Sequence, residues 1–417
     1  MIQGGAPTTT AAGRSRPRQQ QQQQRRRQGG HGQQQRGAPR RRASALASAS
    51  TSASASALPA TAAPPAPFLA DGRPIRDLIP RLHLDNIEEP AAKQMLLERM
   101  VRIPLPVPGF FGGALVDTAV VPPPPQPPAA RTTRAPAPPA PSSPPSPSSL
   151  PPVVCLHGFD SSSLEFRRLH PLLASEPHGL EPWAIDLVGW GFTDAAPFSR
   201  DRAAALPPAA KRAHLLAFWR ERLDGRPMLL VGASLGGAVA MDFAVEHPEA
   251  VAGLALIDPQ AFVDGLGPPP PRSLAEAGVW LLRSVPLRQA ANRMAYFDKD
   301  RFATADAMRC GRLHTHLPGW SDANVAWMGG GGYVLPAERV EAVARPTLLM
   351  WGREDGILSP ALAPRLEATL SGAGVLEGGA TAWLERCGHC GHLEQPEAVA
   401  AAIGAFARRL AAAGDQA

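Results

Sequence analysis

Short apolar runs, each ended by glycine or proline, recur along the chain from residue 152 onward. The runs are PVVCLHG, EPWAIDLVGWG, RPMLLVGAS, VAGLALIDP and ARPTLLMWGRED, and stretches of helical character separate them. After the third run, Val239 and Phe243 stand four residues apart, which suits one face of a helix. Apolar strands that alternate with helices indicate a mostly parallel sheet covered on both faces. The pattern therefore predicts the α/β fold class.

Two segments interrupt this alternation. Residues 94–121 contain two candidate strands, and the proline-rich stretch 121–152 follows them. Because a long insertion adds little closure entropy, we expect 121–152 to be a surface loop between strands of one sheet. Residues 259–344 hold three of the eight tryptophans and both tyrosines. We expect an all-helical insertion there, which forms a lid over a ligand pocket while its side chains pack together.

The first 70 residues differ from the rest in composition. They contain ten arginines, no Asp or Glu, two glutamine runs and a long Ser/Ala stretch. Such a segment has too little apolar surface to form a core. An arginine-rich, serine-rich and acid-free composition is typical of an organelle transit peptide. We interpret 1–70 as a disordered targeting segment for the chloroplast, with the mitochondrion or plain low-complexity sequence as alternatives, and 71–417 as one domain.

The charge balance changes once this segment is set aside. The whole chain has a net charge of +6 and residues 1–70 carry +10, so 71–417 carry 6 − 10 = −4. A basic face is the footprint of nucleic-acid binding, so we expect no nucleic-acid partner. Four cysteines are too few for a disulfide scaffold. No uncharged apolar run reaches the roughly 18 residues of a membrane helix, so we expect no integral membrane segment.

The pentad GASLG, Gly232 to Gly236, has the Gly-x-Ser-x-Gly pattern of a nucleophile elbow. It follows the apolar strand MLLV and opens a helix, which is the expected context for an exposed serine nucleophile, Ser234. The helix N-terminus offers N–H groups to an oxyanion. In LHGF, a turn after an earlier strand can aim a second N–H at the same point. We predict the N–H groups of Phe159 and Leu235 as oxyanion donors and expect His157 to be structural.

A serine nucleophile needs a base and an orienting acid. Asp355 ends a late strand in WGREDG, with Glu354 and Asp258 as alternative acids, and His389 follows the last strand signal, TAWLER. The order Ser234, Asp355, His389 is nucleophile, acid, base.

The segment around His389 also fits other chemistry. Cys387-Gly388-His389-Cys390 has the pattern of a thiol-disulfide oxidoreductase, but it lies near the C-terminus instead of at the start of a βαβ unit. Zinc ligands at 387, 389, 390 and 392 would be crowded. A regulatory disulfide that displaces His389 remains a further alternative.

Five stretches together resemble the α/β-hydrolase fold family over residues 94–412: LHGFDSS, DLVGWGFTD, GASLGGAVA, WGREDG and CGHCGHLEQPEAV. The resemblance extends to plastid hydrolases of plants, although the proline-rich insertion and LSGAGVLEGGAT depart from their pattern. Members commonly end in CGHxxHxExP with the first histidine catalytic, which implies that His389 is the base and His392 a supporting residue.

The resemblance implies an α/β-hydrolase fold, with helices on both faces of the sheet and a helical lid insertion. From these residues we predict a serine hydrolase that cleaves a small-molecule acyl ester through an acyl-enzyme, without metal or organic cofactor. A serine at 234 argues against epoxide hydrolases and haloalkane dehalogenases, whose nucleophile is a carboxylate. Because the fold supports many functions, a weakly catalytic ligand receptor is the main alternative.

Overall fold

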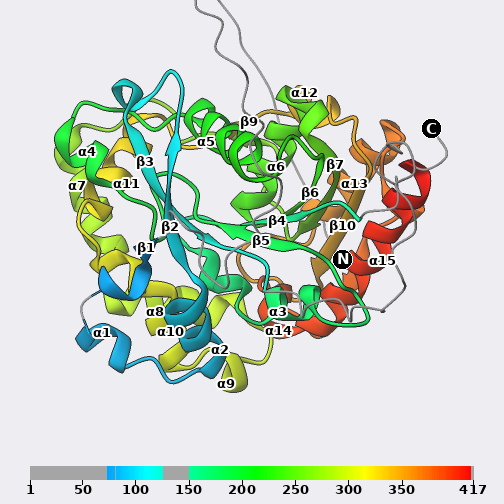
Figure 1. The fold of residues 1–417 in the computed structure, drawn as a ribbon, viewed down its shortest axis with the longest axis horizontal. Helices are drawn as coiled ribbons and strands as arrows, with labels where there is room; N and C mark the ends of the chain where they lie inside the picture. The colour runs from blue at the N-terminus through cyan, green and yellow to red at the C-terminus, as the bar shows by residue number, and fades with distance from the viewer. Residues whose placement is uncertain (1–72, 80, 125–149, 415–417) are drawn as a thin grey trace, which may run out of the picture. The chain divides into compact units, whose positions relative to one another are not determined.

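The computed structural model describes residues 73–79, 81–124 and 150–414, which lie within one compact unit, Ala63–Ala417 (Figure 1). The predicted targeting segment 1–70 and residues 125–149 of the proline-rich insertion lie outside the described residues.

A nine-stranded sheet forms the centre of this unit, in the order β1-β2-β3-β5-β4-β6-β7-β10-β11. Strand β2 is antiparallel to β1 and β3, and β3 is antiparallel to β5. All other neighbouring strands in this order, from β5 to β11, are parallel. Their bounds are β1 Arg73–Pro74, β2 Val101–Pro106, β3 Leu115–Val121, β4 Val153–Leu156, β5 Pro182–Ile185, β6 Met228–Ala233, β7 Val251–Ile257, β10 Thr347–Gly352 and β11 Ala382–Leu384. The mostly parallel sheet confirms the predicted fold class.

Both faces of the sheet are covered, which explains why its strands read as continuous apolar runs. Along β4, Val154 and Leu156 enter one apolar cluster, whereas Val153 and Cys155 enter a second one on the opposite face. The covering helices are α3 (Leu169–Ala174), α5 (Pro208–Arg222), α6 (Leu235–Glu246), α13 (Leu362–Gly372) and the closing helix α15 (Pro396–Gly414). Helix α6 is buried on nearly all sides, because it contacts β4, β6, α5 and α12. The sequence pattern indicated only one buried face for this helix.

Shorter helices complete the framework outside the central layers. They are α1 (Arg81–Asp85), α2 (Pro90–Gln94), α4 (Ala196–Arg200) and α14 (Gly391–Glu394). The proline-rich insertion joins β3 to β4, which belong to the same sheet.

The segment between β7 and β10, here called the insertion, is built mainly from helices: α7 (Arg272–Leu282), α8 (Val285–Ala295), α9 (Lys299–Phe302), α10 (Ala305–Arg312), α11 (Trp320–Gly329) and α12 (Ala337–Glu341). It also contains an antiparallel pair of short strands that the sequence did not predict, β8 (Val263–Asp264) and β9 (Val334–Leu335). Helices α7, α8 and α10 lie on the left and lower left of Figure 1, away from α13 and α15. In the part of the chain that the structure describes, no helix is long and apolar enough to cross a membrane.

Candidate active site

Ser234 stands at the sharp turn between β6 and α6. Its backbone has φ 52° and ψ −121°, a strained conformation for a residue with a side chain. The serine N–H donates to the carbonyl of Ile257 at 3.0 Å, which fixes the turn to the neighbouring strand. A Cβ on Gly232 would lie 2.6 Å from the carbonyl oxygen of Gly236, and one on Gly236 would lie 2.0 Å from that of Leu156. Only glycines therefore allow this close approach.

Asp355 and His389 meet at the carboxyl edge of the sheet, after β10 and β11 respectively. The Nδ1 of His389 lies 2.7 Å from Oδ2 of Asp355, and both side chains are buried. The other carboxylate oxygen accepts the N–H groups of Ile357 at 2.7 Å and Leu358 at 2.9 Å. In this arrangement Nδ1–H of His389 donates a hydrogen bond to Asp355, which leaves Nε2 free to accept a proton.

Neither alternative acid makes a hydrogen bond to His389 in the described structure. Glu354 accepts the backbone N–H of Cys387 at 2.9 Å. Asp258 is fully buried behind Asp355, where its Oδ1 accepts the N–H of Gly352 at 2.7 Å, and its carboxylate lies within 4.8 Å of both Asp355 and His389. Burial, and then the negative charge of Asp355, raise the pKa of Asp258 well above its usual range. The raised pKa of Asp258 favours its protonated form, whereas the contact to His389 is made by Asp355.

Ser234 and His389 line the same cavity, which has a volume of about 330 Å³. The insertion contributes most of its apolar wall, and the loop after β4 contributes Gly158 and Phe159. A Cβ on Gly158 would lie 3.2 Å from that of Ser234, so this loop passes directly beside the nucleophile. The ring of Phe159 packs against Trp327 with centroids 4.8 Å apart. The structure thus brings the predicted serine, histidine and oxyanion loop together.

His157 fixes the loop after β4, and both of its ring nitrogens already have hydrogen-bond partners. Its Nε2 accepts the N–H of Leu187 at 3.0 Å, so Nδ1 carries the hydrogen and donates to the carbonyl of Gly158 at 2.8 Å. Burial lowers the pKa of His157 to about 3. The residue is a structural support, as its sequence context predicted.

Glu165 is a further residue of this cavity, to which the sequence assigned no role. It lies in the 3-10 helix Ser163–Phe166, and its carboxyl accepts the N–H of Gly158 at 3.0 Å and the hydroxyl of Ser161 at 2.6 Å. Glu165 thereby fixes the loop that carries Phe159. Burial raises the pKa of Glu165 to about 8.

This shift predicts how Glu165→Gln changes stability with pH. Between the ordinary pKa of 4.5 and the folded pKa of about 8, the folded chain holds a proton that the unfolded chain has lost. The free energy of unfolding of the wild type therefore falls as pH rises through this window, by up to about 1.4 kcal/mol per pH unit. Glutamine carries no such proton, so the variant should gain stability relative to wild type from pH 5 to pH 8 in urea titrations. A difference that stays constant with pH would contradict the raised pKa.

The loop that carries His389 is bound to the insertion. Its backbone N–H donates to the carbonyl of Ala295, the last residue of α8, at 2.8 Å. Glu394 accepts the N–H of Gly388 at 2.8 Å and that of Asp298 at 2.8 Å. A Cβ on Gly388 would lie 2.5 Å from the carbonyl of Ala295, so glycine is required there. Glu394 is thus a second buried acid whose role sequence reasoning missed.

The two cysteines of this loop lie in an environment that disfavours thiol redox chemistry. Cys387 and Cys390 are both free thiols, and burial raises the pKa of both well above the ordinary value. A thiol that resists ionisation is a weak nucleophile, which argues against a thiol-disulfide oxidoreductase.

The ring of His392 packs on Phe166 with centroids 5.2 Å apart, and burial lowers the pKa of His392 to about 3. His392 is therefore a neutral packing residue.

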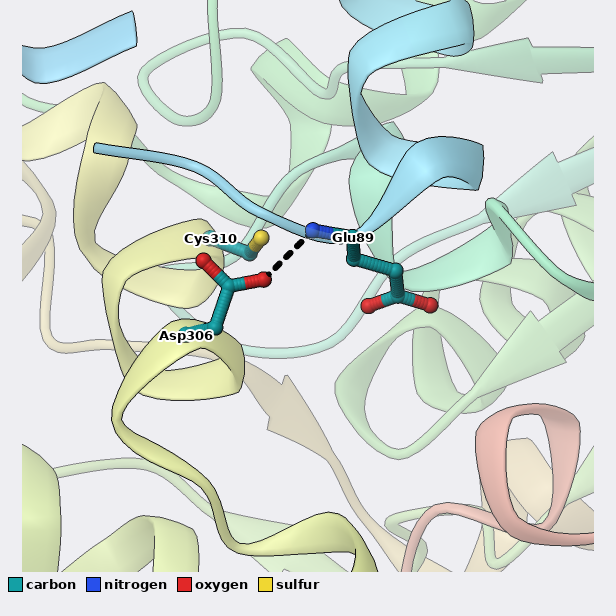
Figure 2. A group of neighbouring side chains, drawn as sticks. All are labelled: Glu89, Asp306 and Cys310. Carbon is teal, nitrogen blue, oxygen red and sulfur yellow. Dashed lines mark hydrogen bonds between the residues drawn. The ribbon is translucent and has the colours of Figure 1, made fainter. Parts of the chain in front are cut away.

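Two groups of side chains in the described residues have the ligand types of a metal site. One is Asp258, Asp355 and His389, and the other is Glu89, Asp306 and Cys310 (Figure 2). Asp306 accepts the backbone N–H groups of Glu88 and Glu89, both at 2.8 Å. The carboxylate of Glu89 pairs with Arg167 at 2.7 Å and with Arg168 at 2.6 Å. These guanidinium groups already neutralise the carboxylate and would repel a cation. The group is a junction between α10 and the segment before α2.

Comparisons with known proteins bear on the family and the fold. The model of the alpha/beta hydrolase family matches residues 153–402. The alpha/beta hydrolase domain-containing protein VTE7 of Arabidopsis thaliana is 37% identical over 344 residues, which cover 81% of this chain and 92% of that protein. A (lyso)-N-acylphosphatidylethanolamine lipase of Mus musculus is 30% identical over 142 residues, or 31% of this chain and 36% of the lipase.

The fold is also found in a solved structure, that of a thermophilic esterase from Thermogutta terrifontis. It superposes with a TM-score of 0.54 at 18% identity and covers 74% of this chain and 98% of the esterase. The family model spans more than half of the chain, and the likeness to the Arabidopsis protein extends over most of both sequences. The chain therefore belongs to the alpha/beta hydrolase family.

Proposed function

We propose that the protein is a serine hydrolase that cleaves carboxylic esters through an acyl-enzyme. The observation that carries this proposal is the 2.7 Å contact between His389 and Asp355, next to a cavity that the strained Ser234 also lines. Ser234 is the nucleophile, His389 the general base and then acid, and Asp355 the orienting acid. Lipases and esterases among the similar proteins support hydrolysis of an ester.

The reaction follows from these roles. His389 Nε2 takes the hydroxyl proton as Ser234 Oγ attacks the ester carbonyl, and the resulting oxyanion accepts the N–H groups of Phe159 and Leu235. Leu235 is the first residue of α6, whose first N–H groups have no partner within the helix. His389 then protonates the leaving alcohol, and a water molecule releases the acid by the same steps in reverse. This chemistry requires neither a metal nor an organic cofactor.

The apolar wall of the cavity favours an ester with an apolar acyl or alcohol group. Leu164, Leu287 and Met308 line it together with Ala291 and Leu393. We infer that the insertion acts as a lid, because α8 forms one side of the cavity and binds the loop of His389. The composition of residues 1–70 supports a plastid location.

A panel of 4-nitrophenyl esters of increasing chain length tests the proposal. We expect a burst of 4-nitrophenol in the first turnover with esters whose acyl-enzyme forms faster than it is hydrolysed. The intact mass of the quenched protein should rise by one acyl group, and a digest should locate that group on the peptide that contains Ser234. Tight ester binding without a burst or turnover would instead support the receptor alternative.

A further inference from the structure

Large apolar side chains are exposed along α7 and α8. Trp280 is 75% exposed and Met294 is 51% exposed. Seven of the twelve exposed large apolar side chains in the described part of the chain lie between residues 272 and 297: Leu274, Trp280, Leu281, Val285, Leu287, Met294 and Phe297. The structure describes every residue of helix α8, and none of them is fully buried; Arg288, Asn292 and Ala295 are half-buried. The surfaces of monomeric soluble proteins rarely concentrate apolar groups in this way unless a partner or a membrane covers them.

This exposed surface continues into the catalytic cavity. Leu287 of α8 and Ile357, which follows Asp355, are each 40% exposed and also line the cavity. Phe159, beside the nucleophile, is 39% exposed and lines it too. Exposed apolar side chains of α8 therefore lie at the cavity that Ser234 also lines.

The charges on this surface have one sign. Residues 277–297 contain three arginines and no Asp or Glu, and 272–301 contain six cations against three acids. Their net charge is thus 6 − 3 = +3, whereas residues 71–417 as a whole carry −4. Arg288 is paired with Asp160, but Arg283 and Arg293 are exposed beside the apolar side chains. Arg312 adds a further cation, because it donates to the carbonyl of Arg283 at 3.1 Å.

We propose that this α7–α8 face, defined by Trp280, Leu281, Val285, Met294, Arg283 and Arg293, docks onto an anionic lipid bilayer. The apolar side chains enter the boundary between headgroups and acyl chains, and the arginines bind lipid phosphates. Docking places the mouth of the cavity at the depth where an apolar ester resides. The attachment is peripheral, since no described helix can cross a membrane.

The test uses the full chain with vesicles of phosphatidylcholine alone or mixed in equal parts with phosphatidylglycerol, each with brominated acyl chains. Residues 1–70 contain no tryptophan, so quenching of tryptophan emission reports only on the rest of the chain. We expect bromolipid to quench the emission in phosphatidylglycerol vesicles, with weaker quenching at high salt. Trp280→Phe should remove most of the quenched emission.

Two variants separate the apolar from the charged contribution. Trp280→Ser/Leu281→Ser should lower the partition coefficient at least about tenfold on both vesicles. Arg283→Gln/Arg293→Gln should lower it by about tenfold or more on anionic vesicles only. Leu115→Ser is the matched control, because Leu115 is 59% exposed but lies on β3, and it should bind as wild type does.

Equal quenching in wild type and Trp280→Phe would overturn the proposal. So would dimerisation that Trp280→Ser abolishes, because a second copy of the chain would then cover this face. Vesicle binding does not require catalysis. Hydrolysis of a soluble short-chain ester, measured without vesicles, therefore reports separately on the proposed function, and failure of one proposal is distinguishable from failure of the other.

Discussion

Ser234→Ala is expected to lower kcat for ester hydrolysis by about 10⁶-fold, the loss typical of removing a serine nucleophile from an intact triad. Alanine lacks the hydroxyl that attacks the ester, while the cavity and the contact between Asp355 and His389 remain. Initial rates with a 4-nitrophenyl ester measure the loss. The same variant should no longer label with a fluorophosphonate, which reacts only with an activated serine.

The cavity offers a matched control for this experiment. Ser161 also lines it, but its hydroxyl donates to Glu165 at 2.6 Å and has no histidine contact in the described structure. Ser161→Ala should therefore keep fluorophosphonate labelling and most of the activity. If labelling survived in Ser234→Ala and disappeared in Ser161→Ala, the nucleophile would have to be reassigned.

Local signals explain why much of the fold could be predicted from the sequence. The parallel strands β4, β5, β6 and β10 are buried at every position and so appear as continuous apolar runs. The strand-turn-helix context of Ser234 requires two glycines at fixed positions. By contrast, the strand pair β8 and β9 has only two residues in each strand, and such short pairs leave no periodic pattern.

The roles of the buried acids could not be predicted, because they depend on contacts between distant parts of the chain. Glu394 binds the N–H of Asp298, which is 96 residues away in sequence, and nothing in the sequence near either residue indicates that contact. Asp258 and Asp355 posed a related difficulty. Each follows a parallel strand, β7 and β10, and these strands are neighbours in the sheet. Sequence order alone therefore left both acids as candidates.

The two acids are expected to differ sharply in their effect on catalysis. Asp355→Asn should lower kcat by about 10⁴-fold, because the amide oxygen stays on the N–H groups of Ile357 and Leu358, and the amide NH2 then faces Nδ1 of the histidine. An NH2 donor at that point holds the histidine in the wrong tautomer. Asp258→Asn should cost no more than about tenfold. The amide oxygen of an asparagine there can still accept the N–H of Gly352, as Oδ1 of Asp258 does.

The pH profile of kcat/KM decides whether Asp258 is protonated as its burial demands. A second negative charge beside His389 would raise the pKa of the histidine, and removing that charge would lower it. The raised pKa of Asp258 predicts that Asp258→Asn removes no charge, so the acid limb of the profile should keep its midpoint. A midpoint that moves to lower pH would mean that Asp258 is ionised next to Asp355. A 10⁴-fold loss in Asp258→Asn together with an active Asp355→Asn would instead make Asp258 the orienting acid, since the histidine would then depend on the carboxylate that follows β7.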